Sequence, residues 1–254
     1  DTLEDFEIAF SGIDLNKITV SMTINGSAIV LMAMYFALAE KKGYDLKNLR
    51  GTAQNDILKE FIGRGTWIFP VDKSVKLVVD TIEYCAKNVP KYSPVSVCGY
   101  HIRESGADPV QEMAYAFCIA KAYSDETIKR GIDIDEFASR LSYNFDIYGN
   151  LFEQIAKFRA GRRLWAKIMH DEYKAKRDES CWLRMIAGGG GAGLTKEQPE
   201  NNIARSAYYA LVSALSGTQT MAICTYDEAF TIPTEKAAEI ALRTMQILIH
   251  EVGV

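Results

Sequence analysis

The chain has 254 residues, of which 48% are hydrophobic and 24% are charged, and its formal net charge is −4. This composition is typical of a globular protein, and the acidic balance argues against a nucleic-acid binder. The longest apolar run, residues 28–39, is too short to cross a bilayer, so we expect no membrane anchor. The first residues, from Asp1 onward, are typical of an amphipathic helix, and we expect no secretory signal.

Five cysteines are scattered through the chain without a CxxC pair, at Cys85, Cys98, Cys118, Cys181 and Cys224. An odd number of dispersed cysteines favours reduced, mostly buried thiols over a disulfide frame or a zinc site. We therefore expect a cytoplasmic protein, or a protein of the mitochondrial matrix in a eukaryote.

Helical and extended patterns alternate along the chain. Residues 2–12 are predicted to form an opening helix. Alternating or β-branched apolar residues predict strands over residues 17–23, 50–54, 95–100, 140–145, 181–187 and 220–225. Apolar residues at helical spacing predict helices over residues 27–42, 57–64, 74–88, 109–130, 150–176, 202–215 and 234–251. A run of four glycines, residues 188–191, follows the fifth strand.

This alternation makes six units of a strand followed by a helix, which implies a parallel sheet with right-handed crossovers. Six units are too few for an eightfold barrel, and a leading helix suggests that its strand is missing. We therefore predict one α/β domain over residues 1–254: a (β/α)8 TIM barrel with about six β/α units present and its amino-terminal part missing. A complete doubly wound sheet is the structural alternative.

The third predicted strand ends in a group of polar residues, Tyr100, His101, Arg103 and Glu104. In a barrel, side chains at the carboxyl ends of the strands form the active site. His101 is one of three histidines in the chain and the only one at a predicted strand end. It is a candidate catalytic residue, although a loop histidine bonded to a backbone carbonyl fits the pattern equally well.

Other predicted strand ends are polar as well. They carry Ser21, Thr23, Thr52, Gln54, Asn55, Asp56, Arg140, Ser142, Asp227 and Glu228. Arg64 lies between two glycines, which would let a ligand approach closely. Simpler alternatives are a helix C-terminal cation for Arg64 and an N-cap or a solvated charge for Asp56 and Glu228. Arg140 could equally pair with a surface acid.

Four long segments carry a family resemblance. They are GTAQNDILKEFIGRGTWIFP (51–70), CGYHIRESGADPVQEMAYAF (98–117), FASRLSYNFDIYGNLFEQIAKFRAGRRLWAKI (137–168) and SGTQTMAICTYDEAFTIPT (216–234). Together they resemble the adenosylcobalamin-dependent acyl-CoA mutases, and within them the large (catalytic) subunit of methylmalonyl-CoA mutase. The resemblance covers essentially the whole chain and implies the later part of a substrate-binding TIM barrel. The implied activity is a radical 1,2-migration of the carbonyl-CoA group, an isomerisation that depends on adenosylcobalamin (vitamin B12).

The resemblance also implies roles for individual residues. His101 would hydrogen-bond the thioester carbonyl, and Tyr100 would pack beside the migrating group. Arg64 would bind the free carboxylate of a malonyl-type substrate, since a guanidinium binds a carboxylate in bidentate geometry. The remaining acyl-CoA contacts would come from Ser21, Thr23, Thr52, Ala53, Gln54, Lys91, Arg140, Leu141 and Ser142.

The implied cofactor contacts are few in this chain: Glu104, Gly188 and Glu228. No D-x-H-x-x-G motif is present, because the residues two before each histidine are Gly99, Ile168 and Leu248. We therefore expect no metal ligand here, and a cobalamin-binding domain on another segment or on a small subunit. A G-protein chaperone and further copies of the chain are the other partners that the resemblance implies.

Residues 184–195, RMIAGGGGAGLT, depart from the family pattern R-x-H-x-Q-T-S-G-W-S-L-T. The usual histidine falls on Ile186, the glutamine on Gly188 and the tryptophan on Ala192. Nearby, Cys224 stands where an asparagine is usual. Smaller side chains would leave room for a larger acyl substituent, so we hypothesise a carboxylated acyl-CoA bulkier than methylmalonyl-CoA, with methylmalonyl-CoA itself as the default.

Two other functions compete with the mutase. Gly188, Gly190 and Gly193 match the G-x-G-x-x-G of nicotinamide dehydrogenases, but no acidic residue lies between Glu200 and Asp227 to bind the ribose. The altered glycine run also fits a catalytically silent, acyl-CoA-binding scaffold subunit. The residues that argue against a silent site are Gln54, Arg64, Tyr100, His101 and Arg140.

Overall fold

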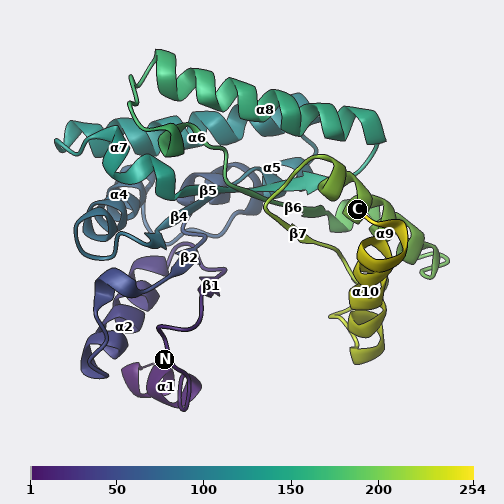
Figure 1. The fold of residues 1–254 in the computed structure, drawn as a ribbon, viewed down its shortest axis with the longest axis horizontal. Helices are drawn as coiled ribbons and strands as arrows, with labels where there is room; N and C mark the ends of the chain where they lie inside the picture. Colours follow the sequence, from purple (N-terminus) through teal and green to yellow (C-terminus); the bar gives the residue numbers. More distant parts are fainter. Residues whose placement is uncertain (1) are drawn as a thin grey trace. The chain divides into compact units, whose positions relative to one another are not determined.

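The computed structural model describes residues 2–254; Asp1, part of the predicted amphipathic start, lies outside the described residues. Helices and strands alternate along the chain (Figure 1). The chain forms two compact units, each built from three separate stretches. Among the described residues, unit 1 comprises residues 2–98, 117–142 and 168–182, and unit 2 comprises residues 99–116, 143–167 and 183–254. Because both units are interleaved in sequence, the expectation of one domain over residues 1–254 stays a prediction.

Unit 1 contains a parallel sheet with the strand order β1 (Val20–Met22), β2 (Gly51–Ala53) and β3 (Tyr92–Ser93). β4 (Val95–Cys98) follows directly, and the Ser96 N–H donates to the Gln54 carbonyl at 2.9 Å. The helices and helical turns are α1 (Leu3–Ala9), α2 (Ala28–Lys41), η1 (Leu46–Asn48), α3 (Ile57–Lys59), η2 (Glu60–Arg64), α4 (Val71–Asn88), α7 (Ile134–Phe137), η3 (Ala138–Arg140) and η4 (Asp178–Cys181). The end of β2 therefore lies beside the start of β4.

The core beneath this sheet is aromatic. Tyr35 and Phe36 of α2 pack with Tyr92 of β3, whose ring stands edge-on to Phe36 at 5.2 Å between centroids. Gly51 has to be glycine, because a Cβ there would collide with the Tyr92 ring and the Val20 carbonyl. The close approach of β1, β2 and this ring fixes the strands whose ends carry the predicted substrate residues.

Unit 2 contains a second parallel arrangement, in the order β5 (Leu141–Ile147), β6 (Met185–Gly189) and β7 (Thr220–Ala222). The first two residues of β5 belong to unit 1. The helices and turns of unit 2 are α5 (Gly99–Glu104), η5 (Gly191–Gly193), α9 (Asn201–Leu215), α10 (Glu235–Ile247) and η6 (Leu248–Val252). α6 (Pro109–Lys129) and α8 (Leu151–Asp171) contribute residues to both units.

The order of the strands within each unit is compatible with both predicted architectures. In each unit, strands that are neighbours in the sheet are also neighbours in the chain. In each half of a doubly wound sheet, as in a barrel, neighbouring strands follow the chain order, and the same holds within each unit here. The mixed α/β fold with parallel sheets is confirmed and agrees with part of a (β/α)8 barrel.

Several predicted boundaries are wrong. The strand predicted over residues 95–100 ends at Cys98, so Tyr100 and His101 lie in the first turn of α5. α5 begins at Gly99, where close packing leaves no room for a Cβ beside Phe145 and Glu112. The strand predicted over residues 181–187 begins later, at Met185, and runs into the glycines as far as Gly189.

Three further boundaries differ. Arg140 lies in the turn η3 and not in the predicted strand 140–145, because the preceding capped turn of α7 runs on into η3. The helix predicted over residues 150–176 ends at Asp171, before Lys174, which adopts a left-handed φ of 57°. The helical run 57–64 changes from α to π geometry at Glu60.

The described part of the chain, residues 2–254, contains no helix that is both long and apolar enough to cross a membrane. Within the same residues, no cluster of three or more His, Cys, Asp or Glu side chains is placed to hold a metal ion. All five cysteines are free thiols, and Cys85, Cys98 and Cys224 are buried.

Tyr35 and Tyr123 are both fully buried in unit 1, yet their hydroxyl groups differ in hydrogen bonding. The Tyr35 hydroxyl has no hydrogen-bond partner among residues 2–254. The Tyr123 hydroxyl donates to Asp56 Oδ1 at 2.7 Å and accepts from the Leu58 N–H at 2.9 Å. Leaving a buried polar group unpaired costs about 1–3 kcal/mol.

We therefore expect Tyr35→Phe to leave the free energy of unfolding unchanged or to raise it. Tyr123→Phe should lower it by about 1–3 kcal/mol, because a buried carboxylate and an N–H lose their partner. Denaturant unfolding followed by circular dichroism measures both variants. A larger loss of stability for Tyr35→Phe than for Tyr123→Phe would contradict this account of the unit 1 core.

Candidate functional site

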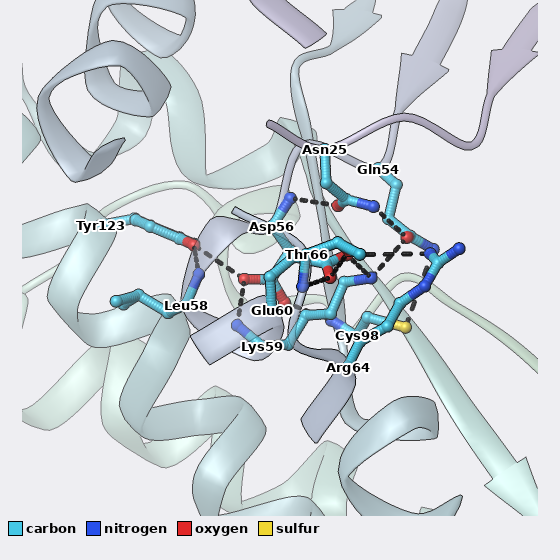
Figure 2. A network of polar contacts seen from close by, with 10 residues as sticks. All are labelled: Asn25, Gln54, Asp56, Leu58, Lys59, Glu60, Arg64, Thr66, Cys98 and Tyr123. Carbon is cyan, nitrogen blue, oxygen red and sulfur yellow. Dashed lines mark hydrogen bonds and ion pairs between the residues drawn. The ribbon is translucent and has the colours of Figure 1, made fainter. Parts of the chain in front are cut away.

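Two groups of polar side chains follow the strand ends, one in each unit. The first, which we call the strand-end network, lies in unit 1 and consists of Asn25, Gln54, Asp56, Lys59, Glu60 and Arg64 (Figure 2). The second, the glycine-segment cluster, lies in unit 2. It consists of Tyr100, Glu104, Asp146 and Cys224 around the segment Gly189–Ala192.

The backbone places Gln54 at the point where β2 ends. Its N–H donates to the Met22 carbonyl at 2.9 Å, and its carbonyl accepts from the Ser96 N–H at 2.9 Å. The next residue, Asn55, has a left-handed φ of 46°, which asparagine tolerates better than most residues. Asn55 is held there because its Nδ2 donates to Thr81 Oγ1 at 2.8 Å and to the Pro94 carbonyl at 2.9 Å.

Asp56 is a structural carboxylate. It is fully buried and accepts hydrogen bonds from the Cys98 N–H and the Tyr123 hydroxyl, each at 2.7 Å. It also accepts from the Lys59 N–H, so the predicted N-cap alternative for Asp56 is confirmed. Burial raises the pKa of Asp56 to about 6, although these hydrogen bonds and the charge of Lys59 oppose the rise.

Lys59 lies at the centre of the network with no exposed surface. Its ammonium donates to Gln54 Oε1 at 2.9 Å and pairs with Glu60 Oε1 at 2.6 Å. Gln54 Oε1 also accepts from Asn25 Nδ2 at 2.9 Å. A buried ammonium needs such partners, because the cost of removing it from water is several kcal/mol.

Glu60 connects Lys59 to Arg64. It is fully buried, and Arg64 Nη1 lies 3.7 Å from its Oε1 while the Arg64 side chain is 45% exposed. Burial raises the pKa of Glu60, but hydrogen bonds from Lys59 and Thr66 and the charges of Lys59 and Arg64 outweigh burial and hold it below its usual value. Arg64 also lies in the last turn of η2, as its simpler alternative predicted.

The other predicted substrate residues of unit 1 lie outside this network. Ser21 and Thr23 are exposed on and just after β1, and Thr52 and Ala53 lie within β2. Lys91 is exposed and donates to Asn48 Oδ1 at 2.8 Å. Among the remaining predicted substrate residues, Arg140 is half-buried and Leu141 is buried. The Ser142 hydroxyl donates to the Val95 carbonyl at 3.3 Å.

In unit 2, Tyr100 and His101 lie side by side in α5, with their rings edge-on at 5.2 Å between centroids. Burial raises the pKa of Tyr100 well above its usual value, and the nearby Cys224, Glu104 and Asp146 raise it further. A hydrogen bond with the Gly191 backbone opposes this rise. The phenol is therefore neutral at physiological pH and is held against the glycine segment.

Side chains also hold the backbone of the segment Gly189–Ala192. Both carboxylate oxygens of Glu104 accept from the Ala192 N–H, at 3.2 and 3.1 Å. The Cys224 thiol donates to the Gly189 carbonyl at 2.7 Å. At Gly190, a Cβ would collide with the carboxyl groups of Glu104 and Asp146, so both groups converge on this one position. The glycines let these side chains reach the main chain.

The Asp146 carboxyl group lies near that of Glu104 beside Gly190, and no cationic side chain among residues 2–254 is bonded to it. It is fully buried, and burial, followed by the charges of Glu104 and Glu112, raises its pKa to about 9. Lys157 lowers the pKa, but its ammonium is bonded to Glu112 Oε2 at 2.8 Å and to the Asp146 carbonyl at 2.6 Å. A fully buried carboxyl group beside the charges of Glu104 and Glu112 ionises only at high cost, so Asp146 keeps its proton at neutral pH.

The space beside the glycine run is filled by the protein itself. A Cβ at Gly188 would collide with the Ala222 carbonyl of β7, and Cβ atoms at Gly189 and Gly193 would collide with Tyr209 of α9. Ala192 is exposed. The hypothesis of an enlarged acyl pocket therefore stays a prediction, and the room for it does not come from Gly188, Gly189 or Gly193.

The sequence did not reveal several members of these groups. Asn25, Lys59 and Glu60 resemble ordinary loop and helix residues, and Asp146 resembles the polar residue of an alternating strand. The one available signal was the position of Asp56-Ile57-Leu58-Lys59-Glu60 directly after a buried strand, where charges are close to the core. Glu228 is exposed and lies near Cys224, and burial together with the charge of Glu228 raises the pKa of that thiol.

Comparison with known proteins matches residues 1–254 to the family model described as methylmalonyl-CoA mutase. A 2-hydroxyisobutanoyl-CoA mutase large subunit from Aquincola tertiaricarbonis is 48% identical over all 254 residues, which cover 45% of its length. Mitochondrial methylmalonyl-CoA mutase from Homo sapiens and methylmalonyl-CoA mutase from Rhizobium meliloti are each 43% identical over the same residues, which cover 34% and 36% of their lengths. The chain thus spans less than half the length of these relatives.

The raised pKa of Asp146 predicts a pH dependence of stability. An unfolded aspartic acid loses its proton near pH 4, whereas Asp146 keeps it up to about pH 9 in the folded protein. Asp146 therefore makes the free energy of unfolding fall as pH rises between these values, by up to about 1.4 kcal/mol per pH unit. Asp146→Asn keeps an oxygen for the Ile147 N–H and a donor for Glu104, but it cannot ionise.

We expect Asp146→Asn to flatten the dependence of unfolding free energy on pH between pH 6 and about pH 9. Denaturant unfolding at several pH values measures this dependence, and Asp171→Asn, at an exposed carboxylate, is the matched control. The same slope in the native protein and in Asp146→Asn would show that Asp146 is already ionised at neutral pH.

Proposed function

The chain belongs to the methylmalonyl-CoA mutase family, and we propose that the protein of which it is part is an adenosylcobalamin-dependent acyl-CoA mutase. The reaction is the 1,2-migration of a carbonyl-CoA group within a carboxylated acyl-CoA. The observation that carries the proposal is the strand-end network, in which a buried ion pair supports the Gln54 amide and the exposed guanidinium of Arg64.

Arg64 is proposed to bind the free carboxylate of the substrate. Its side chain is 45% exposed, and its one described ion-pair contact, with Glu60 at 3.7 Å, is long. Donors of the guanidinium therefore remain for a carboxylate, which it can bind in bidentate geometry. The further acyl-CoA contacts are proposed for Ser21, Thr23, Thr52, Ala53, Gln54, Lys91, Arg140, Leu141 and Ser142, with the cations Lys91 and Arg140 suited to phosphate groups.

His101 and Tyr100 are proposed as the residues at the reacting centre. An imidazole that donates a hydrogen bond to the thioester carbonyl withdraws electron density from the group that migrates. Tyr100 is neutral and half-buried, so it can pack against the migrating group and exclude water without adding charge. Its hydrogen bond with the Gly191 backbone would keep the ring in place.

Adenosylcobalamin supplies, when bound, the radical that starts the rearrangement. Of the three residues assigned to it, Glu228 fits best, because its carboxylate is exposed and can accept hydrogen bonds from ribose hydroxyls. Glu104 is already bonded to the Ala192 N–H, and Gly188 is packed against β7. We therefore propose Glu228 as the residue that holds the ribose, and Glu104 as a support of the glycine segment.

The partners follow from the family. We propose a cobalamin-binding domain on the remainder of the protein or on a separate small subunit, since one relative is named a large subunit. A G-protein chaperone, further copies of the chain, and a location in the cytoplasm or the mitochondrial matrix belong to the same proposal.

The substrate is proposed to be methylmalonyl-CoA or a bulkier carboxylated acyl-CoA. The 48% identity to a 2-hydroxyisobutanoyl-CoA mutase favours a second candidate, a hydroxylated acyl-CoA without a carboxylate. Arg64 separates the two, because a guanidinium has no partner in the second substrate. The dehydrogenase alternative lacks support, since the glycines lie in β6, in η5 and between them, and the next α-helix, α9, begins only at Asn201.

We expect Arg64→Ala to weaken the binding of methylmalonyl-CoA by roughly 100-fold, because it removes a charged hydrogen-bonding partner of a carboxylate. Binding of butanoyl-CoA, which has no carboxylate, should change less than about twofold. Isothermal titration of the complete protein without its cofactor measures both.

Arg243→Ala, at an exposed arginine of α10, is the matched control and should leave both affinities unchanged. Equal losses for the two acyl-CoAs in Arg64→Ala would remove Arg64 from carboxylate recognition. Tight binding of 2-hydroxyisobutanoyl-CoA that does not depend on Arg64 would favour the second candidate.

A further inference from the structure

The direction of the Gln54 amide is determined by its neighbours. An amide side chain has one oxygen that accepts and one nitrogen that donates, and the two are easily exchanged by a rotation of the group. Lys59 has only donors, so the atom of Gln54 that faces its ammonium at 2.9 Å has to be the oxygen. Asn25 Nδ2 donates to the same oxygen at 2.9 Å, which fills both of its lone pairs.

The nitrogen of Gln54 is left with little to bind. Its one hydrogen-bond partner in the described part of the chain is the Cys98 thiol at 3.7 Å, and sulfur is a weak acceptor. At least one N–H of Gln54 is therefore available to a ligand, while the oxygen is not. Gln54 is buried, with 7% of its surface exposed, so the residue keeps a small accessible area.

Lys59 can hold this direction because its own charge is balanced inside the network. Glu60, fully buried and 2.6 Å away, is the counter-charge, and Thr66 donates to the other oxygen of Glu60 from its hydroxyl and its N–H. Figure 2 shows the ammonium between the Gln54 amide and the Glu60 carboxylate. A neutral side chain at this position would remove one of the two donors that hold the Gln54 oxygen and leave Asn25 as the other.

We propose that Lys59 is a positioning residue that makes Gln54 a hydrogen-bond donor, so that the site selects acyl-CoA molecules with an acceptor oxygen at this point. The acceptor is either the thioester carbonyl or the free carboxylate. This inference rests on the proposed function, since it concerns the same acyl-CoA site, and it adds a residue that does not itself contact the ligand.

A double-mutant cycle tests the inference. Affinity for methylmalonyl-CoA is measured by titration of the complete, cofactor-free protein in its native form and as Lys59→Met, Gln54→Ala and the double variant. Lys59→Met should weaken binding about 10-fold more when Gln54 is present than when residue 54 is alanine. Any effect that Lys59→Met exerts through Glu60 or Arg64 is common to both backgrounds and cancels in the cycle.

Two further variants keep the test decisive. Lys87→Met, at an exposed lysine paired with Glu83, should show no coupling to Gln54→Ala. If Lys59→Met does not fold, as judged by its thermal unfolding, Asn25→Ala replaces it. Asn25→Ala removes the other donor to Gln54 Oε1, leaves Lys59 and Glu60 paired, and should be coupled to Gln54→Ala in the same sense.

The two sources of the acceptor are distinguished by the ligand. If Gln54 donates to the thioester carbonyl, the coupling is lost with a thioether analogue of methylmalonyl-CoA that lacks the carbonyl oxygen. If it donates to the carboxylate, the coupling is lost with butanoyl-CoA. Equal fold-losses for Lys59→Met in both backgrounds, with methylmalonyl-CoA still bound by the native protein, would overturn the inference and leave the proposed function standing. Absence of acyl-CoA binding by the native protein would overturn both.

Discussion

The burial of one ammonium group, that of Lys59, governs the arrangement at the end of β2. Removing an ammonium from water costs several kcal/mol, and only close partners of opposite or complementary polarity offset that cost. Here the partners are the Glu60 carboxylate and the Gln54 carbonyl oxygen. Because both are fully or almost fully buried, none of the three can move without leaving another unpaired, and the position of Arg64 relative to Glu60 depends on the same pair.

In the glycine-segment cluster of unit 2, buried charge is limited by protonation and not by an ion pair. Glu104 and Asp146 converge beside Gly190, and the nearest ammonium, that of Lys157, is bonded to Glu112 and to the backbone. With no cation to balance a second charge, a proton on Asp146 takes its place. A cation thus holds the strand-end network together, whereas a proton holds the glycine-segment cluster together. In both cases the buried groups support neighbours that are assigned to the ligand, Gln54 in unit 1 and Tyr100 in unit 2.

The order of the elements could be predicted because apolar periodicity is a local property, and each predicted strand and helix corresponds to an element at about the same place. The residues at which the strands and helices end could not be predicted, because tertiary contacts determine them. The strand before Tyr100 stops at Cys98, and α5 begins at the closely packed Gly99. Gln54 and Arg64 could be identified by resemblance to a family, but Lys59 and Glu60 could not. Adjacent charges at the start of a helix usually face water, and only the folded structure places these two side chains in the interior.

At the glycine run, the sequence led to an expectation of open space that the fold does not show beside Gly188, Gly189 and Gly190. Small side chains were expected to open a pocket, because the sequence records the loss of bulk but not what replaces it. In the fold, the Ala222 carbonyl, Tyr209 and the carboxyl groups of Glu104 and Asp146 occupy the space beside Gly188, Gly189 and Gly190. The glycines bring the backbone close to its own neighbours, so the loss of bulk at Gly188, Gly189 and Gly190 leaves no open space there.

The central claim is that the protein rearranges the carbon skeleton of a carboxylated acyl-CoA, and product analysis tests it most directly. The complete protein, with its cobalamin-binding partner and adenosylcobalamin, is incubated separately with methylmalonyl-CoA, alkyl- and aryl-substituted dicarboxylic acyl-CoAs, and 2-hydroxyisobutanoyl-CoA. Isomeric products are separated by chromatography and identified by mass spectrometry. The account predicts a product with a migrated carbonyl-CoA group from at least one carboxylated substrate. Binding of these acyl-CoAs without any rearranged product would contradict the account and favour a silent scaffold subunit.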